Sequence, residues 1–138
     1  MRVVLDTNVV VSGLLWDGNP ERLIEAAGDG SLILVTSETL IAELSGILDR
    51  AKFAAKLEQK NLTAAQIVAR YRELAEVIEA APIEEVRLRD PDDLTVLACA
   101  VAAKADAMVS GDDDVQNLGS YWGIPIFSPA ECLRRITA

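Results

Sequence analysis

The sequence contains no histidine and only two cysteines, Cys99 and Cys132, which lie 33 positions apart. Neither cysteine belongs to a C-x-x-C pair. Structural zinc sites and Ser–His or Cys–His catalysis depend on imidazole or paired thiolate groups, so this composition leaves them almost nothing to work with. We expect both cysteines to be buried, reduced thiols.

Long apolar runs are also missing, because no segment approaches the roughly 20 residues that a membrane-spanning helix needs. The N-terminus, Met1 and Arg2 followed by three apolar residues and Asp6, is too short a pattern for a secretory signal. Half of the residues are hydrophobic (51%), which excludes a disordered chain. The 138 residues therefore predict one domain, spanning residues 1–138, in a soluble cytoplasmic protein.

Basic residues are scarce, and the net charge of −9 has the wrong sign for a general nucleic-acid binder. Their distribution is uneven, however. Residues 50–72 hold one acid, Glu58, and six bases: Arg50, Lys52, Lys56, Lys60, Arg70 and Arg72. A solvated helical surface explains this basic segment adequately, and a strip that contacts backbone phosphates is the alternative.

Short β-branched runs alternate with longer helical patterns, which is typical of an α/β fold with a parallel sheet. We expect strands at residues 3–5, 32–35, 107–110 and 124–127, with a weak strand at 77–78. Helix-start signals occur at Asn19-Pro20, Thr36-Ser37, Thr63, Asp90-Pro91 and Ser128-Pro129-Ala130-Glu131. Pro125 suggests that the last strand lies at an edge of the sheet.

Three aspartates fall where a parallel sheet would bring them together. Asp6 and Asp112 each follow an apolar strand, and Asp93 lies in the first turn of a helix. Such junctions share the carboxyl edge of the sheet, where open α/β sheets bind ligands. Asp93 shares a helix face with Val96 and Leu97, so we expect it to point inward. Taken singly, each aspartate also fits an ordinary helix start or a solvated turn.

Glu43 lies at the rim of an apolar helix stripe that includes Leu40, Leu44 and Ile47. A charge at this rim is partly desolvated, which is unfavourable unless its oxygens reach a cation. A glutamate whose stem packs while its carboxylate reaches water is the simpler interpretation. Asp114, two positions after Asp112, is a further supporting candidate.

Converging carboxylates repel one another, since two unit charges about 4 Å apart cost on the order of 4 kcal/mol at an effective dielectric of 20. A cluster of three or four therefore needs protonation or a cation. Oxygen ligands without imidazole or thiolate suit Mg²⁺ or Mn²⁺. Such ions can activate water and stabilise the departing oxygen of a phosphodiester.

The ordered set Asp6-Thr7-Asn8-Val9, Glu43, Asp93 and Ser110-Gly111-Asp112 resembles the PIN-domain nucleases, over essentially the whole chain. The segments 89–93 and 107–112 look like the bacterial subgroup of toxins from toxin–antitoxin systems, the relatives of VapC. This resemblance implies a three-layer α/β/α domain with a central parallel sheet of four to five strands. It also implies a Mg²⁺- or Mn²⁺-dependent endonuclease that acts on RNA.

Carried over by position, the resemblance makes Asp6, Glu43, Asp93 and Asp112 the metal-binding acids. It makes Asn8 and Ser110 the polar residues that orient them; threonine is commoner at the position of Ser110, and serine keeps the hydroxyl. Many members of the family form homodimers, and the toxin branch is held inactive by a small antitoxin protein.

The function that we expect is therefore that of an endoribonuclease acting on single-stranded RNA as the toxin of a type II toxin–antitoxin system. Five bases are candidates for guiding the RNA strand: Arg50, Lys52, Lys56, Arg87 and Arg89. Tyr71, Tyr121 and Trp122 could stack on bases. Packing in the core or a surface role is the simpler interpretation of each.

Two other functions remain open from the residues. A phosphatase of the haloacid-dehalogenase type also begins with an aspartate after its first strand. That chemistry needs acids at the positions of Asn8 and Gln116, which this sequence lacks. The other alternative is a non-catalytic PIN-like binding module, in which the same acids form a scaffold stabilised by a cation.

Overall fold

The structure is a computed structural model that describes residues 1–83 and 91–137, without the side chains of residues 91 and 92. Its helices and strands follow one another in this order: β1 (Arg2–Leu5), α1 (Thr7–Leu15), α2 (Asn19–Gly28), β2 (Ile33–Ser37), α3 (Glu38–Leu48), the 3-10 helix η1 (Ala51–Phe53), α4 (Ala54–Gln59), α5 (Ala64–Leu74), β3 (Glu76–Ile78), α6 (Pro91–Ala103), β4 (Ala107–Val109), α7 (Asp113–Asn117), β5 (Ser120–Tyr121), β6 (Ile124–Phe127) and α8 (Pro129–Thr137).

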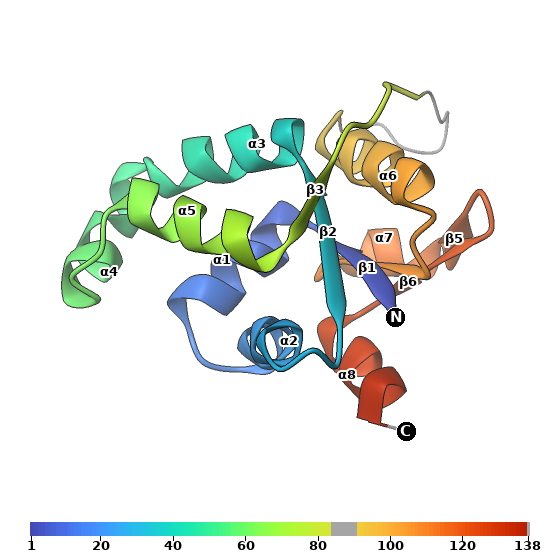
Figure 1. The fold of residues 1–138 in the computed structure, drawn as a ribbon, viewed down its shortest axis with the longest axis horizontal. Coiled ribbons are helices and arrows are strands. Elements are labelled where there is room, and N and C mark those ends of the chain that lie inside the picture. Colours follow the sequence, from blue (N-terminus) through green and yellow to red (C-terminus); the bar gives the residue numbers. More distant parts are fainter. Residues whose placement is uncertain (84–90, 138) are drawn as a thin grey trace.

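The strands form a six-stranded sheet in the order β3-β2-β1-β4-β6-β5 (Figure 1). All neighbouring strands are parallel except β5 and β6, which are antiparallel. Along the chain, β2 and β3 extend the sheet on one side of β1, and β4, β6 and β5 extend it on the other. The order therefore reverses between β1 and β4, and such a switch point opens a crevice at the carboxyl ends of the two strands.

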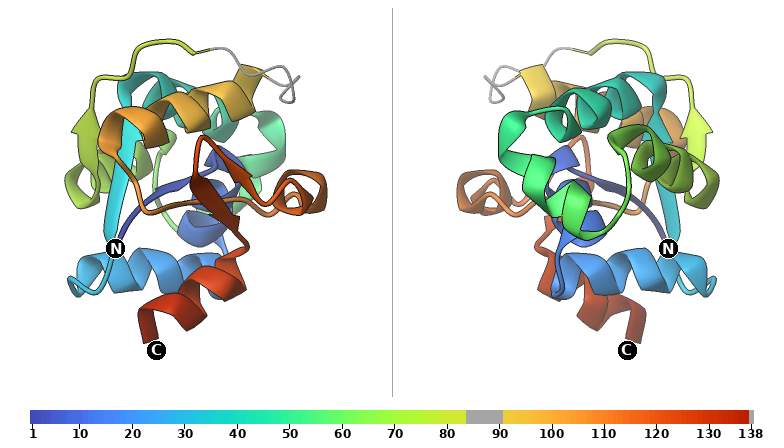
Figure 2. Two further views of the ribbon diagram at one scale, coloured as in Figure 1. Left: turned by 90° about the vertical axis from the view of Figure 1, so that its right-hand side faces the viewer. Right: turned by 90° about the vertical axis from the view of Figure 1, so that its left-hand side faces the viewer.

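Helices cover both faces of the sheet. Side chains alternate between the two faces along a strand, so an apolar strand such as β1 needs a core on each side. Val3 and Leu5 pack into a core with residues of α1, α2, α5 and α8, whereas Val4 packs into a second core, mainly with residues of α6. Figure 2 shows α6 over one side of the sheet, with α2 and α8 on the other. The predicted three-layer α/β/α fold with a central parallel sheet is confirmed, but the sheet has six strands instead of the predicted four to five, and its edge strand β5 is antiparallel.

Several predicted helix starts are confirmed in atomic detail. The Ser37 hydroxyl accepts a hydrogen bond from Leu40 N at 3.3 Å, and α5 begins with a complete capping box between Thr63 and Gln66. In α8, the Ser128 hydroxyl accepts from Glu131 N at 3.1 Å. The predicted cap Asn19 is instead the first residue of α2, which follows Gly18.

The edge position predicted for residues 124–127 is wrong. β6 lies between β4 and β5, and the two-residue strand β5 forms the edge. Pro125 pairs with Ser120 of β5, while only Ile126 and Phe127 pair with β4. Proline is accommodated inside the sheet because it precedes the segment that pairs with β4.

None of the helices in the described part of the chain combines the length and the apolar character needed to cross a membrane.

Candidate active site

Asp6 follows β1 at the switch point of the sheet. Leu5 and Val109 are paired in the register of β1 and β4, and Asp6 N donates to Val109 O at 2.9 Å. Asp6 is also the N-cap residue of α1, yet its side chain accepts no capping hydrogen bond. Aspartate at this position usually caps the helix with its carboxylate. Here the carboxylate lines the crevice instead.

Ser110 connects the ends of the two central strands. Its hydroxyl donates to Asp6 Oδ2 at 3.4 Å and accepts from Asp112 N at 3.1 Å. Ser110 is buried, and its carbonyl oxygen accepts from Gln116 Nε2 at 2.7 Å. Its own N–H donates to Phe127 O at 3.0 Å. The side chain and the backbone of Ser110 are therefore both held in place beside Asp6.

Asp112 is exposed and forms the N-cap of the short helix α7. Its Oδ1 accepts from Asp114 N at 2.8 Å, which holds one carboxylate oxygen near the helix start. Asp114 lies in the first turn of α7 with an exposed side chain, and it is not among the residues that line the crevice.

Two other acids approach the crevice from helices. Asp93, in the first turn of α6, is partly buried, as the shared face with Val96 and Leu97 predicted. Glu43, in the middle of α3, is partly buried beside Ile47, which agrees with its predicted place at the rim of an apolar stripe.

The four predicted acids meet around one crevice, which we call the acidic pocket. Its volume is about 450 Å³. It is lined by Asp6, Asn8, Val9, Ser12, Pro20, Glu43, Ile47, Arg50, Asp93, Gly111, Asp112 and Pro129. Contributions from α1, α3, α6 and the loop after β4 show that distant segments form one site at the carboxyl edge of the sheet.

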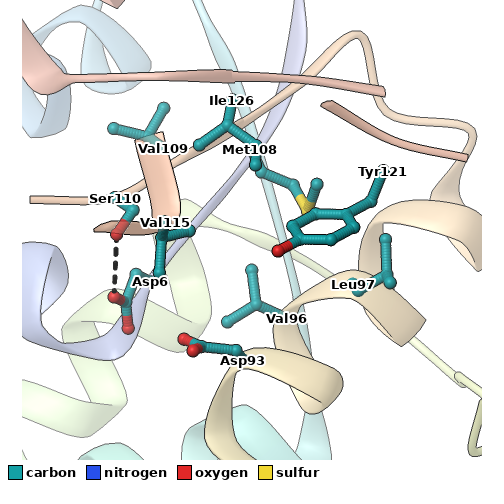
Figure 3. A pocket seen from close by; sticks show the side chains of 10 residues that line it. All are labelled: Asp6, Asp93, Val96, Leu97, Met108, Val109, Ser110, Val115, Tyr121 and Ile126. Atoms are coloured by element: carbon teal, nitrogen blue, oxygen red, sulfur yellow. Dashed lines mark hydrogen bonds between the residues drawn. The ribbon is translucent and has the colours of Figure 1, made fainter. Parts of the chain in front are cut away.

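A narrow apolar cavity of about 20 Å³ lies behind two of these acids. Figure 3 shows the carboxylates of Asp6 and Asp93 pointing toward one another, with Val96, Val115 and Tyr121 beside them. Apolar walls weaken the screening of charge by water, so the repulsion between the two aspartates is strengthened there. This environment favours the arrival of a cation.

The donor chemistry of the acidic pocket fits a hard divalent ion. Its four acids offer carboxylate oxygens, and its lining includes no cysteine. Within the described residues, no group of three or more acidic or thiol side chains is gathered closely enough to count as a ready-made metal cluster. The acids are therefore distributed around the pocket, which also holds the cation Arg50.

The predicted RNA-guiding bases fall into three groups. Arg50 lines the acidic pocket. Lys52 and Lys56 lie over the rings of Phe53 and Trp16, at 5.0 and 5.6 Å from the ring centroids. The other two, at positions 87 and 89, lie outside the described residues, as does the predicted helix cap at position 90.

Sequence reasoning missed several contributors to the site. Ser12 lines the acidic pocket and lies four residues after Asn8, on the same face of α1. This spacing would have indicated Ser12 if the sequence patterns had predicted a helix at α1. Pro129 also lines the pocket, and Gln116 holds the Ser110 carbonyl. No local pattern marks these two residues as part of a site.

The remaining candidates lie mostly in the core. Cys99 and Cys132 are free and fully buried, as predicted, and burial raises the pKa of their thiols to about 12 and about 11. Tyr71 and Tyr121 are buried, which confirms the interpretation as core residues, whereas Trp122 is 56% exposed.

Comparisons with known proteins bear on the family and the fold of this chain. The sequence matches the family described as PIN domain over residues 2–114. No curated protein matches it. Among solved structures, it is similar to a chain in the crystal structure of VapBC2 from Rickettsia felis bound to a DNA fragment from their promoter. The TM-score is 0.64 and the identity 18%, over 93% of this chain and 98% of that one, so the likeness is one of fold.

Proposed function

Because the chain belongs to the PIN domain family, we propose that it is a metal-dependent endoribonuclease that hydrolyses phosphodiester bonds of single-stranded RNA. The observation that carries the proposal is the meeting of Asp6, Glu43, Asp93 and Asp112 around one pocket at the switch point of the sheet. PIN domains are generally nucleases, and the match covers all four acids.

Mg²⁺ or Mn²⁺ is the cofactor that we propose, because the available donors are carboxylate oxygens. A bound ion of this kind would supply an activated water and neutralise negative charge on the phosphate. Asp6 and Asp93, whose carboxylates point toward one another, would be the principal ligands. Glu43 and Asp112 would bind directly or through water.

The surrounding residues have positioning roles in this proposal. Ser110 would keep the Asp6 carboxylate oriented through its hydroxyl, and Asn8 would contribute a polar group at the pocket wall. Glu43 or Asp112 could accept the proton of the attacking water, since each lines the pocket with a carboxylate. Arg50, the base among the lining residues, would contact a phosphate of the strand.

The test is cleavage of a panel of single-stranded RNAs by the wild type and by Asp6→Asn, with Mn²⁺, Mg²⁺ or EDTA. We expect cleavage that requires a divalent ion and falls at least 100-fold in Asp6→Asn, the scale of losing a principal electrostatic group. Cleavage indifferent to both EDTA and the substitution would come from a contaminant and would contradict the proposal.

The two alternative functions predict other outcomes, which need assays of phosphomonoester hydrolysis and of thermal stability beside the RNA cleavage assay. If the protein were a phosphatase, the Asp93→Asn variant would still hydrolyse a simple phosphomonoester, whereas the Asp6→Asn variant would not. The PIN domain match gives the phosphatase alternative no support. A non-catalytic binding module would be stabilised by Mn²⁺ without cleaving any RNA in the panel.

We also propose that the protein is the toxin of a type II toxin–antitoxin system, a homodimer inhibited by a cognate antitoxin in the cytoplasm. The resemblance to VapC relatives and the similarity in fold to a chain of VapBC2 support this assignment. Induced expression of the wild type should arrest growth of a bacterial host, whereas Asp6→Asn should not. Equal growth of the two strains would contradict the toxin assignment.

A further inference from the structure

An exposed aromatic side chain with two lysines lies at the end of α1. Trp16 is 43% exposed, and its ring meets that of the buried Phe53 edge to face, with centroids 6.0 Å apart. Lys56 Nζ lies 5.6 Å from the Trp16 ring, and Lys52 Nζ lies 5.0 Å from the Phe53 ring. We call Trp16, Lys52, Phe53 and Lys56 the Trp16 platform.

Two backbone hydrogen bonds connect the Trp16 platform to residues that line the acidic pocket. Ser12 lines the pocket, and Trp16 N donates to Ser12 O at 3.0 Å, one helical turn away. Arg50 also lines the pocket, and Phe53 N donates to Arg50 O at 3.0 Å. One turn of helix rises about 5 Å, so the platform lies within a short distance of the pocket wall.

Three cations lie on or next to the Trp16 platform, although the chain as a whole is acidic. The net charge is −9, yet Arg50, Lys52 and Lys56 bring three cations to this side of the pocket. Phe53 is 8% exposed and packs against the Trp16 ring at an interplanar angle of 63°, while 43% of Trp16 remains exposed to solvent. An exposed aromatic ring flanked by cations matches single-stranded nucleic acid, whose bases stack and whose phosphates are negative.

We propose that the Trp16 platform binds the RNA strand next to the scissile bond, with one base stacked on Trp16 and neighbouring phosphates near Lys52 and Lys56. This inference rests on the proposed ribonuclease function and specifies how its substrate is held. It predicts a preference for unpaired RNA, because a base inside a duplex cannot offer its face to the ring.

Tryptophan fluorescence tests the stacking directly. The background for this test is the Asp6→Asn variant, which should bind RNA without cutting it. Adding Trp122→Phe leaves Trp16 as the sole tryptophan, whereas adding Trp16→Phe leaves only Trp122. We expect a single-stranded RNA of about 12 nucleotides to quench the Trp16 signal strongly. A duplex of the same sequence should quench it far less, and the Trp122 signal should change little with either RNA.

Affinity measurements provide a matched pair of variants. In the same Asp6→Asn background, Trp16→Ala should weaken binding of fluorescein-labelled RNA by roughly 5- to 150-fold, the loss of one base stack. Trp122→Ala, which removes the other exposed tryptophan, should leave the affinity unchanged. Lys52→Ala and Lys56→Ala should each reduce the slope of log affinity against log salt by about 0.7.

Distinct outcomes separate this inference from the proposed function. If the wild type cleaves RNA and Trp16→Ala retains its affinity and KM, the stacking proposal is wrong while the ribonuclease assignment stands. If Trp16→Ala changes only the oligomeric state in size-exclusion chromatography, the platform is an interface between copies of the chain, and the proposal is again wrong. Absence of RNA binding by every variant would overturn both.

Discussion

At the scale of single residues, Asp6 departs from the ordinary behaviour of an aspartate at a helix start. Its carboxylate accepts no capping hydrogen bond from α1. Instead it accepts a hydrogen bond from the Ser110 hydroxyl at 3.4 Å. The same hydroxyl accepts from Asp112 N at 3.1 Å. One buried serine thus links two of the proposed metal-binding acids, which makes it a positioning residue.

Ser110→Ala should therefore lower the affinity for Mn²⁺ and the rate of RNA cleavage by about 10- to 100-fold, the usual effect of losing a hydrogen bond to a metal ligand. The reason is that the Asp6 carboxylate loses its donor and Asp112 N loses its acceptor. Cleavage rates measured across a Mn²⁺ titration test this expectation. Ser110→Thr, which keeps the hydroxyl, is the control and should retain most of the activity. Equal losses in the two variants would show that packing, and not the hydroxyl, matters at this position.

At the scale of helices and strands, α1 is the longest of the described elements that sequence patterns did not predict. Three consecutive valines, at positions 9–11, favour a strand because β-branched side chains lose rotamer freedom in a helix. All three are nevertheless buried in the core against other helices, and this packing outweighs their intrinsic preference. The helix matters for the site, because Asn8, Val9 and Ser12 line the acidic pocket from it.

Contact between α1 and α2 requires a glycine. A Cβ atom at Gly13 would lie 2.8 Å from Pro20 O and 2.9 Å from Ile24 Cγ1, closer than such atoms can approach. Gly13→Ala should destabilise the protein by about 1–3 kcal/mol, because the backbone of α2 must shift. Urea unfolding followed by circular dichroism measures this change.

Gly46→Ala in α3 is the matched control for that experiment, since a Cβ atom there meets nothing within 4 Å. Alanine should stabilise this helix by about 0.5–1 kcal/mol relative to glycine. A shift of both urea midpoints in the same direction would contradict the close-approach explanation for Gly13.

At the scale of the whole molecule, charge and topology act together. The chain carries a net charge of −9 and has no histidine, and the switch point of its sheet gathers four acids around one pocket. Folding therefore brings like charges together, and their repulsion lowers the stability of the folded state. A divalent ion that binds only the folded chain should offset that repulsion.

Mn²⁺ should accordingly raise the melting temperature of the wild type. Binding to the folded state alone stabilises it by about 2.7 kcal/mol when the free ion is at 100 times its Kd. Thermal melts with Mn²⁺ and with EDTA measure the effect, and Asp6→Asn should show a much smaller increase. Identical melting temperatures in Mn²⁺ and EDTA would count against both the nuclease and the cation-stabilised scaffold.

Much of this protein could be predicted from the amino-acid sequence by itself. Five of the six strands, the caps at Ser37 and Thr63, and the positions of Asp6 and Asp112 after strands follow from periodicity and capping, which act over a few residues. The lack of histidine and of paired cysteines likewise indicated a site with oxygen donors. These properties need no knowledge of which strands are neighbours.

Only the tertiary structure decided how these pieces meet. It placed β6 inside the sheet, joined Ser110 to Asp6 across 104 positions of sequence, and brought Trp16 against Phe53 beside the acidic pocket. Local preferences cannot specify such contacts, because strand order and helix packing depend on which buried surfaces fit one another over the whole chain. The acids were therefore visible in the sequence, whereas the pocket that unites them depends on the fold.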